Sequence, residues 1–139
     1  MAEFTGPDYK TLQANGQHGN ARVAILKYEA AGEAAASILK LGKLPGAAFV
    51  YDVVCFHDDL GTGNTLDVGF RYVTTADGTS DDNYWFDNKD TATAGARTVS
   101  AAEPVLIADG NGVEIIVTTA GAAVTGTIYV IVAYDWVGQ

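Results

Sequence analysis

The chain has 139 residues, 48% of them hydrophobic, and a formal net charge of −9. Its length suits one domain, and its hydrophobic content excludes a mostly disordered protein. The negative charge argues against a nucleic-acid partner, because phosphate recognition needs clustered Lys and Arg side chains. No apolar run approaches the roughly 20 residues that span a bilayer, and the polar start lacks a signal-peptide pattern. We therefore expect a soluble protein that is not exported by that route and has no membrane partner.

Residues 1–20 are predicted to form an extended N-terminal arm ahead of a single β-sandwich domain at residues 21–139. Glycine and asparagine are frequent in this segment, whereas apolar side chains are few and widely spaced. Such an arm is either a docking element or a disordered tail. The contact candidates within it are Phe4, Tyr9, Lys10 and Leu12.

Charge is distributed unevenly along the chain. Residues 1–43 contain five of the eight basic residues but only four of the seventeen acidic ones. If the early strands share a face, the less acidic side of the molecule would meet a partner. The single cysteine, Cys55, excludes an internal disulfide and fits a reducing cytosol.

The first half of the chain predicts β-strands in succession. Residues 22–30 and 37–45 are short segments rich in apolar side chains, and Pro45 closes the second. Residues 47–59 carry apolar side chains on both faces, with Phe49, Tyr51, Val53 and Cys55 on one and Val50, Val54 and Phe56 on the other. This pattern predicts a central strand covered on both sides. Residues 64–74 alternate apolar and polar side chains, which indicates one buried face.

The last third predicts a β-meander. Asn111-Gly112 lies between apolar runs, and Asn-Gly is a strong signal for a hairpin turn. In the closing strand, Ile128, Val130, Val132, Tyr134 and Trp136 share one face, which needs a second sheet or a neighbouring subunit to cover it. No segment sustains a helical period; the best short-helix candidates are residues 30–37 and 83–96. An all-β fold, an antiparallel β-sandwich, is the expected class.

Few residues suggest chemistry. The two histidines, His18 and His57, lack partners for a catalytic set, so no enzyme and no cofactor is expected. Cys55 and His57 could form half of a zinc site, but no second pair completes it, so a buried cysteine beside a satisfied histidine is the favoured interpretation.

Residues 77–90 combine five aspartates with three consecutive aromatic side chains. This segment lacks the spacing of an EF-hand loop, yet calcium accepts irregular oxygen cages, which leaves Asp81, Asp82, Asp87 and Asp90 as weak calcium candidates. Tyr84 or Trp85 could stack on a sugar. The favoured interpretation is a crossover between sheets. In it Thr79 or Ser80 caps a short helix, and Tyr84, Trp85 and Phe86 anchor the connection to the sandwich or to a neighbouring subunit.

The order of these segments resembles small structural proteins of tailed bacteriophages, the capsid decoration (cement) or head-fibre proteins. The resemblance is carried by ILKLGKLPGAAFVYDVVCFHDDLGTGNTLDVGFRY at Ile38–Tyr72 and by TGTIYVIVAY at Thr125–Tyr134. It implies a jelly-roll-like β-sandwich, commonly assembled as a homotrimer, that binds the major capsid protein on the outside of a virion. It also implies synthesis in the host cytoplasm, and it transfers no catalytic residues.

The leading hypothesis is therefore a non-enzymatic virion structural protein that stabilises a capsid. Its arm and early strands would face the shell, and the aromatic edge at residues 127–136, with Tyr134 and Trp136, would bury the trimer contact. The alternatives are a carbohydrate-binding or calcium-binding β-sandwich module, and another phage structural part such as a tail protein.

Overall fold

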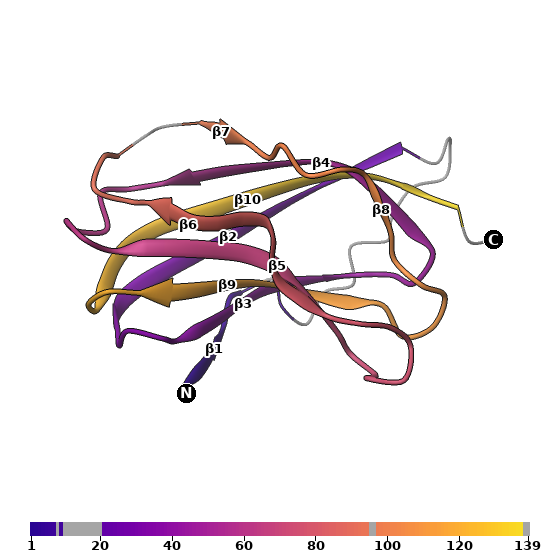
Figure 1. Cartoon of the computed structure of the whole chain (residues 1–139), viewed down its shortest axis with the longest axis horizontal. Coiled ribbons are helices and arrows are strands. Elements are labelled where there is room, and N and C mark those ends of the chain that lie inside the picture. The colour runs from indigo at the N-terminus through magenta and orange to yellow at the C-terminus, as the bar shows by residue number, and fades with distance from the viewer. Residues whose placement is uncertain (8, 10–20, 95–96, 138–139) are drawn as a thin grey trace.

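A computed structural model describes residues 1–7, 9, 21–94 and 97–137. Its strands form two sheets packed against each other (Figure 1). Sheet A contains, in spatial order, β1 (Glu3–Thr5), β3 (Ile38–Leu44), β9 (Val113–Ala120), β5 (Thr65–Tyr72) and β6 (Asp81–Asp90). Sheet B contains β2 (Ala21–Glu33), β10 (Val124–Trp136), β4 (Ala48–His57) and β7 (Thr98–Val99), and β8 (Val105–Leu106) also pairs with β4.

The fold is all-β, as predicted. No α-helix is found within the described residues, so the short helices expected at residues 30–37 and 83–96 are absent there. Residues 30–33 instead complete β2, and residues 83–90 belong to β6. In particular, the Ser80 hydroxyl does not cap a helix but accepts a hydrogen bond from the Tyr72 backbone at 2.9 Å. Pairing with β5 gives the backbone groups of β6 hydrogen-bond partners. A short isolated helix is only marginally stable in water and does not compete with this pairing.

No helix in the described ranges is long and apolar enough to cross a membrane.

The core lies between the sheets, where inward-facing side chains from both form one cluster. The alternation predicted for residues 64–74 is confirmed, because Leu66, Val68, Phe70 and Tyr72 are buried. The apolar stripe of β10 is covered by sheet A, with Ile128, Val130, Val132 and Tyr134 at most 1% exposed. The second sheet thus covers that stripe, and no neighbouring subunit is needed.

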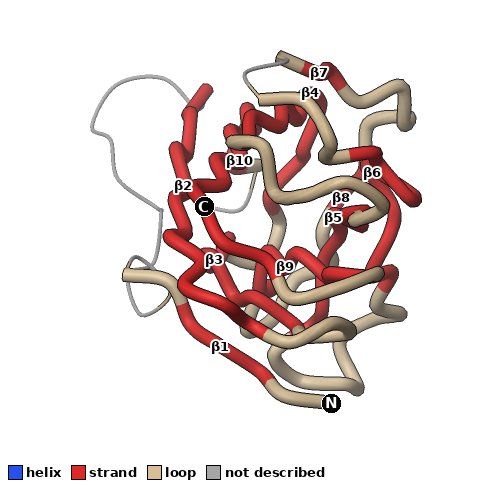
Figure 2. Tube along the Cα trace, turned by 90° about the vertical axis from the view of Figure 1, so that its left-hand side faces the viewer, coloured by secondary structure: helices blue, strands red, loops and turns tan. Residues whose placement is uncertain are grey.

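The first residues of the expected arm form part of sheet A. β1 pairs with β3 in parallel, from Glu3 opposite Ile38 to Thr5 opposite Lys40, while the other strand pairs are antiparallel. The Gly6 backbone N–H donates to the Lys40 carbonyl at 2.6 Å, which continues this pairing. Figure 2 shows β1, β3 and β2 along one side of the molecule.

The predicted meander in the last third is wrong, because β8, β9 and β10 lie alternately in sheets B, A and B. The turn at Asp109–Gly112 therefore connects two sheets and does not close a hairpin. Gly110 and Gly112 have φ values of 143° and 78°, whereas a type I′ turn would require positive φ at Asn111 as well. Asn111 is held by Asp77, whose carboxylate accepts its backbone N–H at 2.9 Å.

β4 lies inside sheet B as expected, but its two faces differ from the predicted ones. Ala133 pairs with Asp52 and Tyr134 with Val50, so Tyr51 is an extra residue in a β-bulge. Beyond the bulge the alternation shifts by one residue. Val50 and Val53 consequently both point into the core, while Phe49 and Tyr51 are 36% and 42% exposed.

Candidate interaction surfaces

The segment with the most suggestive sequence, residues 77–90, forms β6 and the turn before it. Its aspartates engage separate local partners. The Asp81 and Asp90 carboxylates accept hydrogen bonds from the backbone N–H groups of Asn83 and Ala92, respectively. The Asp82 carboxylate accepts a hydrogen bond from the Arg71 guanidinium at 3.3 Å. Asp87 accepts the Asn88 side-chain amide at 2.7 Å. No cluster of three or more metal-binding side chains occurs among the described residues, so the structure does not bring the calcium candidates together.

The three aromatic residues of β6 belong to the core or its border. Trp85 and Phe86 are adjacent in sequence yet both are buried. Tyr84 is half-buried, and its hydroxyl donates to the Glu103 carbonyl at 3.0 Å. The Trp85 ring lies 5.5 Å from Phe70 and 5.9 Å from Tyr84, measured between centroids. Trp85 and Phe86 thus anchor β6 to its own sandwich and offer almost no surface to a second protein.

The pairing of β6 with β5 is irregular on both sides of Phe86. Val68 pairs with Phe86 and Phe70 with Asp81, so residues 82–85 oppose the single residue Gly69, which allows Trp85 and Phe86 both to be buried. Leu66 pairs with Lys89 and Val68 with Phe86, so Asp87 and Asn88 together oppose one residue of β5, Asp67. Asn88 has a φ of 52°, and its backbone N–H donates to the Asp67 carboxylate at 2.7 Å. The irregular register breaks the usual alternation between the two sides of a strand.

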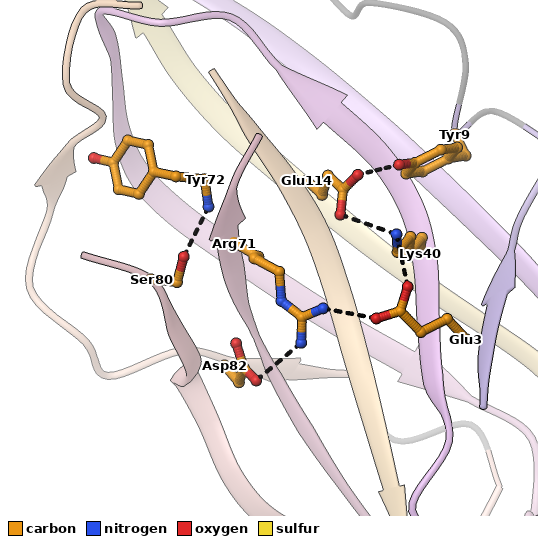
Figure 3. A network of polar contacts seen from close by, with 8 residues as sticks. All are labelled: Glu3, Tyr9, Lys40, Arg71, Tyr72, Ser80, Asp82 and Glu114. Carbon is orange, nitrogen blue, oxygen red and sulfur yellow. Dashed lines mark hydrogen bonds and ion pairs between the residues drawn. The ribbon is translucent and has the colours of Figure 1, made fainter. Parts of the chain in front are cut away.

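The start of the chain is fastened to the outer face of sheet A by a polar network (Figure 3). The Lys40 ammonium lies 2.9 Å from the Glu3 carboxylate and 3.5 Å from Glu114. Arg71 bridges Glu3, at 2.9 Å, and Asp82. Hydrogen bonding to Lys40, followed by that to Arg71, lowers the pKa of Glu3.

Tyr9 joins this network from the predicted arm. Its hydroxyl donates a hydrogen bond to Glu114, and its ring lies 4.8 Å from the Lys43 ammonium and 5.4 Å from Lys40. Desolvation, followed by the hydrogen bond to Glu114, raises the pKa of Tyr9. Phe4 packs partly buried against the core cluster. The other two arm candidates, Lys10 and Leu12, lie outside the described residues.

The aromatic residues of β10 do not form an edge. β10 lies between β2 and β4, so the predicted aromatic edge is wrong, and Tyr134 is only 1% exposed. Trp136 is half-buried; its indole N–H donates to the Gly46 carbonyl at 3.0 Å, and the Arg22 guanidinium lies 5.5 Å from its ring. Tyr134 therefore offers no contact surface, while Trp136 offers a partial one.

The outer face of sheet B is a second candidate surface, which the sequence analysis did not predict. Val23 and Ile25 of β2 are 63% and 61% exposed, and Tyr129 of β10 is 36% exposed. The signal was present, because apolar side chains occupy both faces of residues 22–26, but the pattern alone could not say which face would be covered.

Cys55 and His57 lie on the inner side of β4 and are both buried. Burial raises the pKa of the Cys55 thiol to about 11. The His57 Nδ1 atom lies 2.6 Å from the Asp58 carbonyl oxygen, while Nε2 has no partner among the described residues. The cysteine is buried as predicted, but within the described part of the chain the histidine is satisfied only at Nδ1 and not at Nε2. Burial disfavours the thiolate, which is the reactive form of the cysteine.

Comparison with known proteins gives a likeness of fold. No protein-family model matches the chain, and no curated protein matches it. A chain from the capsid of Ralstonia phage GP4 superposes with a TM-score of 0.74 and 21% identity, covering 99% of this chain and all of the other. A chain from the Cyanophage Pam1 capsid gives 0.63 and 20% over 88% and 90% of the two chains. A chain from the capsid of Helicobacter pylori bacteriophage KHP30 gives 0.58 and 17% over 86% and 90%.

Proposed function

We propose that this chain is a non-enzymatic structural protein of a tailed-phage virion, which binds the outer surface of the capsid and stabilises it. The observation that carries the proposal is the likeness of nearly the whole chain to chains of three phage capsid structures. Such a protein needs a rigid body and surfaces for contact with other proteins. The two-sheet sandwich and the exposed apolar side chains of sheet B suit these two needs. Its partners would be the major capsid protein and copies of itself.

The proposal includes a jelly-roll topology and a homotrimer. The jelly roll is supported by the strand order, since β2 to β5 run in the order sheet B, A, B, A, β6 pairs beside β5 in sheet A, and β7, β9 and β10 follow in sheets B, A and B. For the trimer, the interface cannot use Tyr134, which is 1% exposed. Analytical ultracentrifugation of the free protein and of protein released from shells would measure its assembly state.

Stabilisation would follow from mass action. A protein that binds the assembled shell better than its free subunits raises the free energy needed to take the shell apart. Shells made without this protein should therefore bind it in co-sedimentation, and their disruption temperature should rise with its concentration. The proposal fails if the protein is absent from purified virions by mass spectrometry, or if it binds isolated tails and not shells.

A further inference from the structure

The two outer faces of the sandwich differ in chemistry. On sheet A, Lys40 and Arg71 form ion pairs with Glu3, Glu114 and Asp82. Sheet B instead carries most of the exposed large hydrophobic side chains found in the described residues: Val23, Ile25, Phe49, Tyr51, Val99, Leu106 and Tyr129. A concentration of apolar side chains on one face indicates a contact surface.

A row of paired apolar side chains crosses sheet B and joins exposed Ile25 to exposed Val99; its two middle members are less exposed, with Ile131 half-buried and Val54 5% exposed. Ile131 of β10 pairs with Ile25 on one side and with Val54 of β4 on the other, and Val54 pairs with Val99 of β7. Directly paired residues in a sheet have their Cβ atoms about 5 Å apart, so the row is contiguous from β2 to β7. Tyr129 lies two residues before Ile131 in β10, on the same outer side of the sheet.

The charge beside this row is negative. Asp52 pairs with Ala133, and Asp135 pairs with Phe49, which places both carboxylates on the outer side of sheet B. A small cavity is lined by Tyr51, Asp52 and Glu103, so a third carboxylate lies nearby. None of the three forms an ion pair with any described residue, whereas Lys27 of β2 is 2.5 Å from Glu29.

We propose that the outer face of sheet B docks onto a different protein, whose surface is apolar and bordered by Lys or Arg side chains. Two copies joined through this face would bring the unpaired carboxylates of both into one interface, which like-charge repulsion disfavours. A basic border on the partner would pair with Asp52 and Asp135 while its apolar centre covers Ile25 and Tyr129. The inference rests on the proposed function, in which this partner is the shell protein.

Two matched pairs of variants test the proposal on shells that lack the protein. Ile25→Glu places a charge in the apolar row, and Val73→Glu makes the same change at a 42% exposed valine beyond the end of β5 in sheet A. Asp52→Lys reverses a charge beside the row, and Asp87→Lys reverses an exposed aspartate of β6. Circular dichroism and thermal unfolding establish that each variant is folded.

We expect Ile25→Glu and Asp52→Lys each to raise the dissociation constant for shells at least tenfold, with little change for the two controls. If the wild-type protein does not bind shells, the proposed function itself fails. If the wild-type protein binds and a folded Ile25→Glu variant binds equally well, only the docking face is wrong. Self-association of the wild-type protein that Ile25→Glu abolishes would identify a second copy as the occupant and overturn the proposal.

Discussion

At the scale of single residues, Glu3 ties the beginning of the chain to strands far along the sequence. Its carboxylate contacts Lys40 of β3 and Arg71 of β5, and Arg71 continues to Asp82 of β6. Glu3 thus links β1 to β3 and β5, and Arg71 extends the network to β6. Sequence reasoning placed Glu3 in an arm because local composition does not indicate that β1 pairs with β3.

The Glu3 contacts predict a pH-dependent contribution to stability. Because these contacts lower the pKa of Glu3 in the folded state below 4.5, its contribution is present above that pH. The contribution is lost as pH falls through the lowered pKa. Glu3→Gln should therefore unfold at a lower urea concentration than the wild type at neutral pH, and the difference should vanish once Glu3 is protonated. Glu103→Gln, at an exposed carboxylate without an ion pair among the described residues, is the control; an equal loss in both variants would contradict this role.

Cys55 should be nearly inert in the folded protein. Its pKa of about 11 reduces the thiolate fraction at neutral pH about 100-fold relative to an ordinary cysteine, because each pKa unit is a factor of ten. Burial blocks access as well. Labelling with a thiol reagent should be slow in buffer and fast in urea, and the single cysteine makes the labelled site unambiguous. Rapid labelling without denaturant would show that this end of β4 opens easily.

At the scale of elements, the sequence predicted strands where alternation is regular and failed where it is interrupted. The buried face of β5 was predicted correctly, whereas Gly69 on its other face is buried beneath β6. β4 and β6 contain bulges, and a bulge moves every later side chain to the other face. Apolar periodicity cannot reveal where an extra residue is inserted, so β6 resembles a helix, and the pattern places Tyr51 on the same face as Val53 and Cys55.

Trp85 should be the main anchor of β6. Replacing a buried Trp by Ala removes its packing and leaves a cavity, which costs about 3–5 kcal/mol in the free energy of unfolding. Trp85→Ala should shift the urea midpoint strongly, whereas Tyr84→Phe, which removes only the hydroxyl bonded to Glu103, should cost about 1 kcal/mol. Equal effects of the two substitutions would mean that the strand is held by its hydrogen bonds more than by Trp85.

At the scale of the whole molecule, the sequence predicted the class of fold but not its connections. Short apolar strands without helical periodicity indicate a sandwich, because such strands can bury a face only against another sheet. Turn signals such as Asn111-Gly112 do not indicate whether the chain reverses within one sheet or crosses to the other. The exposed residues of the candidate surfaces could not be predicted for the same reason. Tyr134 and Ile25 are both apolar strand residues, and only the tertiary structure shows that Tyr134 is buried and Ile25 is exposed.

The dispersion of the β6 aspartates predicts no specific response to calcium. A ligand that binds only the folded state raises the unfolding temperature in proportion to the logarithm of its concentration. Asp81, Asp82, Asp87 and Asp90 each engage a different local partner. The unfolding temperature in millimolar calcium should therefore equal the unfolding temperature in sodium chloride of the same ionic strength. A rise specific to calcium, lost in Asp87→Asn, would restore the calcium-binding module as a candidate.

The position of β10 between β2 and β4 has a consequence for how the molecule folds. β2 is among the first strands made on the ribosome, yet along its whole length it pairs with β10, which is made last. Contacts between such distant segments slow folding, because a long loop must close before they form. Until residues 124–136 emerge, β2 and β4 lack their common neighbour and expose apolar strands to other chains. We therefore expect this domain to fold only after β10 has left the ribosome, with synthesis rate and temperature strongly affecting the soluble yield.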